Sequence, residues 1–268
     1  MTYMPDANWD NVCFILVGTT HPGNIGAAAR AMKSMGIRRL ALVQPKHFPC
    51  AEATAMASGA DDLLADAEVW NSLPDALRDY AMVVGTSARQ RRIDWPAMDP
   101  RHCATEIARL ATQQRVAIVF GREHSGLSND ELEYCNATVR IPTVPGFSSL
   151  NLAAAVQILA YEIYLAGLVR AEVHGRSPAV LKTPRASAEA MLQFYAHLQQ
   201  TMTDVGFFDP QKPRRLMRRL RRLFNRAALD TDEVQILRGF LAAVQGRGLK
   251  VGSGSTGGPS INSKCPAV

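Results

Sequence analysis

The sequence predicts an α/β fold in which helices cover both faces of a parallel sheet, followed by a small C-terminal helical domain. Three observations support this fold class. Short apolar runs typical of buried strands alternate with helical stretches over the first 170 residues. A polar segment that contains Gly and Pro but no apolar period follows. Three further helical stretches then precede a Gly/Ser-rich end. We therefore expect a sheet domain at 1–170, a linker at 171–187, a helical domain at 188–248 and a disordered tail at 249–268.

The elements follow from the apolar pattern and from local start signals. The predicted strands are 12–17, 39–43, 82–85, 116–120 and 138–141. The predicted helices of the sheet domain are 24–35, 51–60, 73–80, 102–112, 128–135 and 150–168, and those of the helical domain lie near 186–204, 211–226 and 231–246. Ser128 or Asn129 is expected to cap one helix, and Ser148 or Ser149 to cap the helix that starts at Leu150.

Composition favours a globular protein with a polyanionic partner. Of 268 residues, 47% are hydrophobic, and no apolar run approaches the roughly 20 residues needed to cross a membrane. The polar, acidic N-terminus lacks the features of a secretory signal, so we expect a cytoplasmic protein. Its five scattered cysteines form no metal-binding pattern, which predicts reduced thiols and no metal. The net charge of +6 suits a polyanion.

Two strand ends carry loops suited to ligand binding. The first strand leads through a loop into a helix that has Gly26 near its start and Arg30 one turn further on, an arrangement that suits an anion such as a phosphate. The strand at 116–120 ends at Gly121, where a ligand could approach the backbone closely. Glu123 follows; it could hold Arg30 or Asn24 in place, face a cationic group, or be an ordinary solvated carboxylate.

The stretch from Phe147 to Asn151 forms the mouth of an apolar helix. A cap explains one serine, but it does not explain two serines and Asn151 together, since Asn is a poor helix former. Ser149 and Asn151 can both donate and accept hydrogen bonds. Because the carboxyl ends of parallel strands form the usual ligand edge of such sheets, we expect all these loops to meet there. No glycine-rich dinucleotide or nucleoside triphosphate loop is present in the sequence.

Together, these three segments resemble the motifs of the SPOUT superfamily of RNA methyltransferases, and the Ser149-Leu150-Asn151 form resembles its ribose 2′-O-methylating branch. The similarity extends over roughly residues 11 to 245 and is greatest to the bacterial tRNA methyltransferases that act on cytidine or uridine 32 of the anticodon loop. It implies a SPOUT catalytic domain at 1–170 whose C-terminal part forms a trefoil knot. It also implies S-adenosyl-L-methionine as cofactor, tRNA as partner and a homodimer that builds its site across two subunits.

The resemblance also implies roles for particular residues. The catalytic residues would be Arg30, Ser149, Asn151 and Glu123, without a metal. Because Arg is normally protonated, Arg30 is expected to orient the target phosphate or ribose and to stabilise charge while the hydroxyl loses its proton. The residues expected to bind the cofactor are Thr86, Ser87, Ala88, Gly121, Ile141, Ser148, Ser149 and Leu150. Two other functions stay open: methylation of ribosomal RNA, or a catalytically silent RNA-binding role.

RNA contacts are expected at the motif loops and on one basic helix. Asn24 and Arg30 would contact the RNA beside the reacting ribose. Within residues 212–222, six Arg and one Lys occur without an acid, and such a cluster repels itself unless an anion is near. A solvated basic face is the plainer alternative, but we favour RNA. The residues expected to bind it are Arg214, Arg215, Arg218, Arg219 and Arg222.

Overall fold

The computed structural model describes residues 9–88, 97–147, 149–173, 183–211 and 215–251. Its sheet has seven parallel strands in the order β3-β2-β1-β6-β4-β7-β5. These strands are β1 (Val12–Val17), β2 (Arg39–Val43), β3 (Glu68–Trp70), β4 (Met82–Thr86), β5 (Ala97–Met98), β6 (Val116–Phe120) and β7 (Ala137–Val139). The predicted α/β class with a parallel sheet is therefore confirmed, while the trefoil knot stays a prediction.

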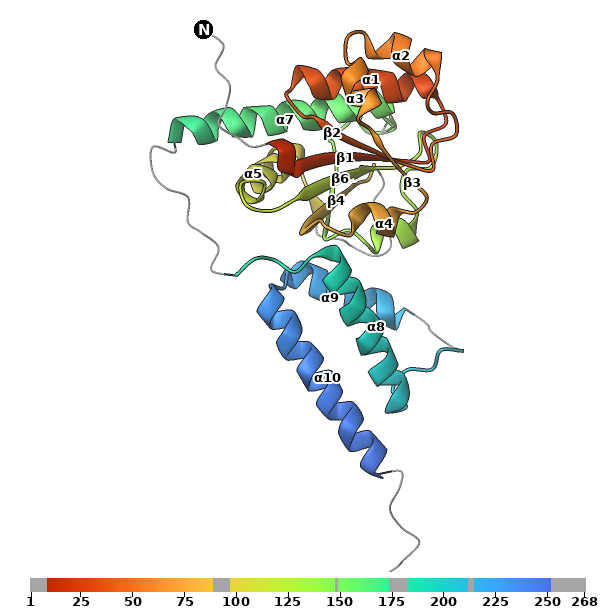
Figure 1. Cartoon of the computed structure of the whole chain (residues 1–268), viewed down its shortest axis with the longest axis vertical. Coiled ribbons are helices and arrows are strands. Elements are labelled where there is room, and N and C mark those ends of the chain that lie inside the picture. The colour runs from red at the N-terminus through yellow and green to blue at the C-terminus, as the bar shows by residue number, and fades with distance from the viewer. Residues whose placement is uncertain (1–8, 89–96, 148, 174–182, 212–214, 252–268) are drawn as a thin grey trace, which may run out of the picture.

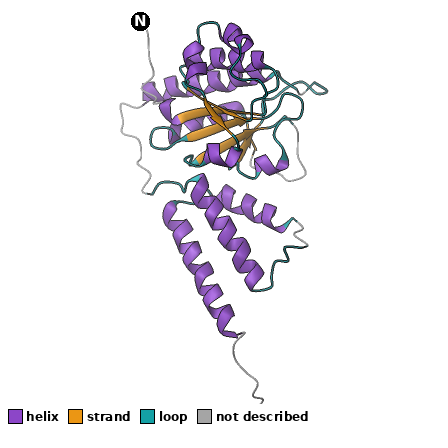
Figure 2. Cartoon of the chain, turned by 45° about the vertical axis from the view of Figure 1, so that its right-hand side comes forward, coloured by secondary structure: helices purple, strands orange, loops and turns teal. Residues whose placement is uncertain are grey.

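Helices lie on both faces of this sheet, and three more form a separate bundle (Figures 1 and 2). The sheet region contains a 3-10 turn at Trp9–Asn11 and the helices α1 (Pro22–Ser34), α2 (Ala51–Ala57), α3 (Asp61–Ala65), α4 (Leu73–Leu77), α5 (Pro100–Leu110), α6 (Asn129–Leu132) and α7 (Leu152–Val173). The bundle contains α8 (Ala188–Asp204), α9 (Leu216–Ala227) and α10 (Thr231–Val251). Helix α10 thus runs past the predicted end of the helical domain at residue 248. Residues 252–268, most of the predicted tail, lie outside the described residues.

The two faces of the sheet have separate apolar cores because successive side chains of a strand point to opposite sides. Phe14 of β1 is fully buried in the core formed with α1, α5 and α7, and its ring lies 5.3 Å from that of Phe120. Its neighbour Ile15 belongs to the core formed with α4 and α6. All six residues of β1 are buried, as expected for a central parallel strand with both faces covered.

Helix α7 corrects one expectation from the sequence. Among the described residues, the segment Leu152–Val169 is long and apolar enough to cross a membrane, by length and composition only, so the expectation of no such run was wrong. The core helix of a globular protein passes the same test, and α7 packs along α1 and α5 through residues such as Val156 and Ile163. Tyr161 and Val169 remain exposed on its other side. One long side of α7 is therefore apolar and uncovered in the single chain.

The bundle of α8, α9 and α10 has its own small core. Phe194 and Tyr195 of α8 are buried there with Val234 and Leu241 of α10. Phe224 of α9 contributes an edge-to-face ring contact to Phe194 at 4.9 Å between centroids. The bundle also contacts the sheet region, because the backbone N–H of Ala188 donates to the carbonyl of Tyr80. The end of α4 and the start of α8 are thus joined directly.

Candidate active site

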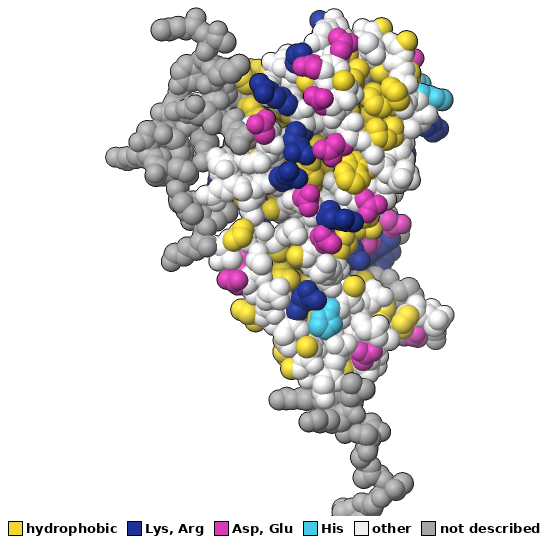
Figure 3. Space-filling model, in the orientation of Figure 1, with side chains coloured by type: hydrophobic (Ala, Val, Ile, Leu, Met, Phe, Trp, Pro, Cys, Tyr) yellow, Lys and Arg dark blue, Asp and Glu magenta, His cyan; other side chains and the backbone are white. Residues whose placement is uncertain are grey.

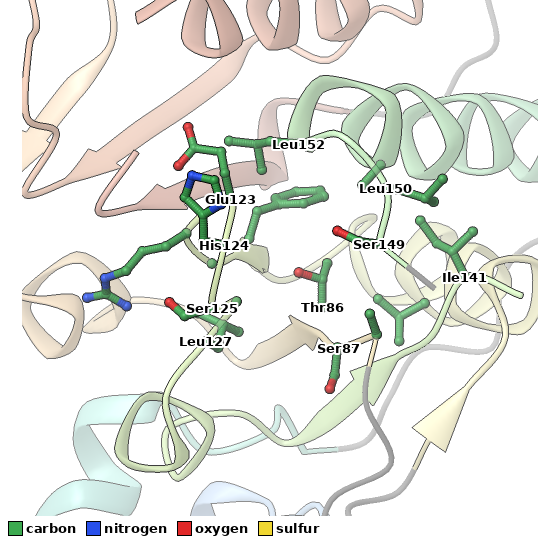
Figure 4. A pocket seen from close by; sticks show the side chains of 17 residues that line it. Thr86, Ser87, Glu123, His124, Ser125, Leu127, Ile141, Ser149, Leu150 and Leu152 are labelled. Carbon is green, nitrogen blue, oxygen red and sulfur yellow. The ribbon is translucent and has the colours of Figure 1, made fainter. Parts of the chain in front are cut away.

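A cavity of about 190 Å³ opens at the carboxyl ends of β4, β6 and β7. This is the edge at which parallel sheets bind ligands. Apolar side chains, among them Leu127, Ile141 and Leu152, form much of its wall. In Figure 4 the hydroxyl groups of Thr86 and Ser149 project into the same space from different elements. The cavity therefore combines apolar walls, strand-end backbone and a few polar groups, as small-molecule sites do.

Most of the residues predicted to bind the cofactor line this cavity. They are Thr86, Ser87, Ala88, Gly121, Ile141, Ser149 and Leu150. Ser148 lies outside the described residues. The structure thus brings together residues from three distant loops, while their role in binding a cofactor stays a prediction.

Glu123 joins two of the motif loops. Its carboxylate accepts hydrogen bonds from the Thr20 N–H at 3.2 Å, the Thr20 hydroxyl at 2.9 Å, the His21 N–H at 3.2 Å and Asn24 Nδ2 at 3.1 Å. Burial disfavours the charged carboxylate, but hydrogen bonds from Asn24 and from backbone N–H groups outweigh it and lower the pKa of Glu123 to about 2. Of the partners considered from the sequence, the described contacts place Asn24, not Arg30, against this carboxylate.

Asn151 connects the third motif to the first. Its Nδ2 donates to Asn24 Oδ1 at 3.0 Å, and its Oδ1 accepts from the backbone N–H groups of Ala153 at 2.9 Å and Ala154 at 3.3 Å. Asn151 is therefore the cap of α7, and the expectation that Ser148 or Ser149 caps this helix was wrong. Because the amide satisfies the helix end itself, the Ser149 hydroxyl is left to face the cavity.

Asn24 is the centre of this network. It donates to Glu123 and accepts from Asn151, so it uses both ends of its amide between two other motifs. The chain Glu123–Asn24–Asn151 runs from the loop after β6 through the start of α1 to the cap of α7. A change in any one of these side chains should disturb the other two.

Arg30 lies apart from the cavity. It is exposed on α1, about 9 Å along the helix axis from Asn24 at 1.5 Å per residue. Among the described residues, its guanidinium has no hydrogen bond or ion pair, and it is not part of the cavity wall. The single chain therefore does not bring Arg30 together with Ser149.

The loop after β6 supplies wall residues to which the sequence analysis assigned no role. Arg122 lines the cavity and makes a two-point ion pair with Glu131, at 3.1 and 3.0 Å. Its side chain occupies the space beside Gly18, where a Cβ atom would come within 2.8 Å of Arg122 Nε. His124, Ser125 and Leu127 of the same loop also line the cavity, as does Ala155 of α7. Their position directly beside the motif residues is the one sequence signal that could have identified them.

The reason for Gly121 differs from the one inferred from the sequence. A Cβ atom there would lie 2.1 Å from the carbonyl carbon of Gly126, so the glycine permits the return of its own loop rather than only the approach of a ligand. The same loop ends at Ser128, which caps α6 in a reciprocal capping box with Glu131, and this confirms one of the two predicted caps.

The remaining polar groups near the motifs give no sign of a metal centre. His21 and His124 approach edge to face at 6.3 Å between ring centroids. Within the part of the chain that the structure describes, no three His, Cys, Asp or Glu side chains group as metal ligands would. The described cysteines, at 13, 50, 103 and 135, are free thiols.

The basic helix α9 is divided between two uses. Arg218 is engaged with acids of the sheet region, at 2.6 Å from Asp130 Oδ1 and 2.6 Å from Glu133 Oε1. In the described chain, Arg215, Arg219, Arg222 and Arg226 have no ion pair. Arg214 lies outside the described residues. In the single chain, nearby carboxylates already pair with Arg218, so its expected contact with RNA stays a prediction.

Comparisons with known proteins agree with this architecture. Residues 11–161 match the SpoU rRNA methylase family, and residues 189–254 match the C-terminal domain of the tRNA methyltransferase TrmJ. A protein of Pseudomonas aeruginosa named tRNA (cytidine/uridine/adenosine-2′-O-)-methyltransferase TrmJ is 50% identical over 242 residues, which are 88% of this chain and 94% of that protein. A Cronobacter sakazakii protein named tRNA (cytidine/uridine-2′-O-)-methyltransferase TrmJ is 45% identical, over 88% of this chain and 96% of its own.

Solved structures show the same relationship. The crystal structure of TrmJ from Zymomonas mobilis ZM4 matches with a TM-score of 0.75 and 33% identity, over 87% of this chain and 98% of that one. A methylase family protein from Haemophilus influenzae is 37% identical with a TM-score of 0.59, over 91% of this chain and 99% of that one. The chain belongs to the SpoU methylase family of methyltransferases, and its C-terminal domain places it among the TrmJ-type enzymes.

Proposed function

We propose that this protein transfers the methyl group of S-adenosyl-L-methionine to the ribose 2′-hydroxyl of cytidine or uridine 32 in the tRNA anticodon loop. The observation that carries the proposal is the match over nearly the whole length of relatives named as tRNA 2′-O-methyltransferases. The cavity supports it, because the loops of the second and third motifs meet there and Asn24 of the first motif is hydrogen-bonded to both.

The cavity suits the cofactor chemically. Its apolar wall of Leu127, Ile141 and Leu152 fits an adenine ring, and the backbone at Gly121 can recognise a base edge. The hydroxyls of Thr86 and Ser149 provide hydrogen bonds for a ribose or a carboxylate. When bound, the cofactor supplies an activated methyl group on a sulfonium. The Glu123 carboxylate stays ionised near neutral pH, so it can favour a positive charge in this cavity.

The chain's part in the reaction is to orient the attacking hydroxyl and to help it lose a proton. Ser149 faces the cavity, and the adjacent network of Glu123, Asn24 and Asn151 fixes the loop that carries it. Such positioning accounts for much of the rate enhancement when two reactants must be aligned. Arg30 is assigned to the phosphate or ribose of the target nucleotide, where its positive charge stabilises the developing alkoxide.

The position of Arg30 supports a site completed by a second subunit. Arg30 does not reach the cavity of its own chain, while α7 leaves an apolar side uncovered. Covering that side in a symmetric homodimer would bury exposed residues such as Tyr161 and Val169. We assign Arg30 to the cavity of the partner subunit, so that each of two sites draws residues from both chains.

The free arginines of α9 are assigned to tRNA phosphates. Arg215, Arg219, Arg222 and Arg226 recur at intervals of four, three and four residues, which places them on one stripe of the helix. We call these four residues the arginine stripe. A row of cations along one helix face fits the regular spacing of phosphates on an RNA backbone.

Adenosine at position 32 is a second candidate substrate. The name of the Pseudomonas aeruginosa relative includes adenosine, whereas the name of the Cronobacter sakazakii relative lists cytidine and uridine alone. The description of the matched family also names ribosomal RNA. Ribosomal RNA is therefore an alternative substrate to be tested beside tRNA.

The test is methyl transfer to defined transcripts. Four tRNAs that differ only in carrying C, U, A or G at position 32 are incubated with the protein and S-adenosylmethionine, and nucleoside mass spectrometry locates the methyl group. We expect methylation of the C and U transcripts, and of the A transcript if the broader specificity applies. A transcript with 2′-deoxyribose at position 32 is the matched control. Methylation of ribosomal RNA but of none of the tRNAs would refute the proposal.

A further inference from the structure

Helix α9 presents a second polar face beside the arginine stripe. Arg218, Arg221 and Asn225 are spaced three and four residues apart, so they lie within about 60° of one another around the helix. This face is turned to the sheet region, because all three side chains have partners there or in the seam between the two regions. We call these residues the docking face.

The charges of the docking face are well matched. Arg218 bridges Asp130 and Glu133 at 2.6 Å each, and Arg221 Nε lies 3.8 Å from Glu133 Oε2. Only 18% of the Glu133 side chain and 20% of the Arg221 side chain are exposed, so solvent screens this part of the cluster less than an ordinary surface pair. Arg221 also lies over the Tyr195 ring, at 5.1 Å from its centroid.

Asn225 fixes the register of the contact. Its side chain is buried at 6% exposure, and its Nδ2 donates to the carbonyl of Cys135 in the sheet region at 3.0 Å. Its Oδ1 accepts from the Tyr195 hydroxyl of α8 at 2.6 Å. A buried amide satisfied at both ends accepts only one arrangement of its partners, since an unsatisfied buried group is costly. The contact is therefore specific in geometry as well as in charge.

The docking face rests on the helix that supports the cavity. Asp130 belongs to α6 and Glu133 directly follows it, while Glu131 of the same helix holds Arg122 in the cavity wall. Figure 3 shows acidic and basic side chains interleaved on the side of the molecule turned to the viewer. Helix α9 is thus held against the element that shapes the loop after β6.

The geometry points to Asp130, Glu133 and Asn225 as positioning residues for the RNA substrate. They hold the helical domain at a set place on the catalytic domain, so that the arginine stripe and the cavity act on one tRNA at a fixed separation. This inference rests on the proposed function. Loss of the docking contact would leave both domains folded but free to move relative to each other. Binding of tRNA would then have to fix their arrangement, and the entropy lost in doing so would weaken binding.

The first test uses the isosteric double variant Asp130→Asn/Glu133→Gln in the full chain. We expect KM for tRNA to rise about tenfold, with kcat and cofactor affinity nearly unchanged. A change of this size is typical when the coupling between two parts of a protein, here between domain docking and tRNA binding, is lost. Small-angle X-ray scattering should show a larger radius of gyration. A merely structural defect would lower kcat or cofactor binding instead, and such a result would overturn the inference, as would an unchanged KM.

The second test is a pair of double-mutant cycles on KM for tRNA. Glu133→Gln and Arg218→Gln should be strongly non-additive, because each removes the same contact. Glu133→Gln and Arg219→Gln should be additive, because Arg219 belongs to the arginine stripe. Additivity in the first cycle would overturn the positioning role alone. If the unaltered chain methylated no tRNA, the proposed function itself would fail, and the scattering measurement would still report whether the contact orders the domains.

Discussion

Glu123 shows how one carboxylate can organise a site. Hydrogen bonds hold its pKa at about 2, below the ordinary value of 4.5. A lowered folded-state pKa contributes stability that is present above pH 4.5 and is lost as the pH falls from 4.5 towards 2. Since Glu123 is only partly buried and solvent screens its charge, we discount this contribution to about 1 kcal/mol. Denaturant unfolding between pH 2.5 and 6 should show this loss in the unaltered chain.

Replacing Glu123 by Gln should remove that pH dependence and lower methyl transfer by about tenfold to a hundredfold, because the Asn24 side chain of α1 and the His21 N–H lose a charged acceptor. Glu106→Gln is the matched control, since Glu106 also has a lowered pKa but pairs with Arg109 on α5, away from the cavity. Equal activity of the two variants would contradict a role for Glu123.

At single residues, the sequence predicted which loops meet but not how they meet. Ser149, Gly121 and Thr86 follow strands or precede a helix, and this local signal was enough to place them at the cavity. The partner of Glu123 was open between Asn24 and Arg30, and the pair Arg122–Glu131 was missed. These contacts depend on side-chain direction across loops that are distant in sequence, which no local pattern specifies.

At the level of elements, the missing side chain of Gly26 allows α1 and α2 to pack closely. A Cβ atom at Gly26 would lie 2.0 Å from the carbonyl oxygen of Ala53, so Gly26→Ala must push two backbones apart. We expect it to destabilise the catalytic domain by about 3 kcal/mol, measured by denaturant unfolding. The control Gly239→Ala lies in α10 with nothing within 4 Å, and it should stabilise the bundle by about 0.5–1 kcal/mol. Similar effects of both changes would mean that this close approach is not needed.

The arginine stripe gives a second prediction for an element. The triple change Arg219→Glu, Arg222→Glu and Arg226→Glu should weaken tRNA binding and reduce the slope of log K against log salt by about 2 to 3, because each phosphate contact releases roughly one counterion. Filter binding across salt concentrations measures the slope. The control Arg38→Glu/Arg115→Glu changes charges that precede β2 and β6, at the edge of the sheet opposite the cavity. An unchanged slope in the triple variant would leave the stripe as a solvated face.

Helices and strands were predicted correctly where the apolar pattern was long. The prediction failed where contacts with other parts of the chain determine whether an element forms. The five predicted strands are present to within two residues at either end. The edge strands β3 and β5 were missed, because three and two residues carry no readable alternation and pair only where a neighbouring strand is available. Helix α9 begins at Leu216, later than the predicted residue 211. The docking of α9 on α6 was hidden altogether, since its arginines read equally well as RNA ligands.

At the scale of the whole molecule, the position of Arg30 makes the oligomer part of the mechanism. Arg30→Ala should abolish methyl transfer while the fold and cofactor affinity stay near normal, because the residue lies outside the cavity of its own chain. Ile141→Trp should abolish activity for a different reason, since the larger side chain fills the cavity that Ile141 lines. Calorimetric titration with S-adenosylmethionine distinguishes the two variants, and light scattering after size exclusion should show both as dimers.

Mixing these two inactive variants tests which chain supplies Arg30. If Arg30 acts in the partner's cavity, a mixed dimer has one complete site: the open cavity of the Arg30→Ala chain, served by the intact Arg30 of the Ile141→Trp chain. Random exchange makes half of the dimers mixed, each with one working site of two, so activity should return to about a quarter of the unaltered rate. If Arg30 served its own cavity, no mixed dimer would contain a complete site. A mixture that stays inactive after subunit exchange, confirmed with differently tagged chains, would therefore place the whole reaction within one subunit and remove Arg30 from the shared site.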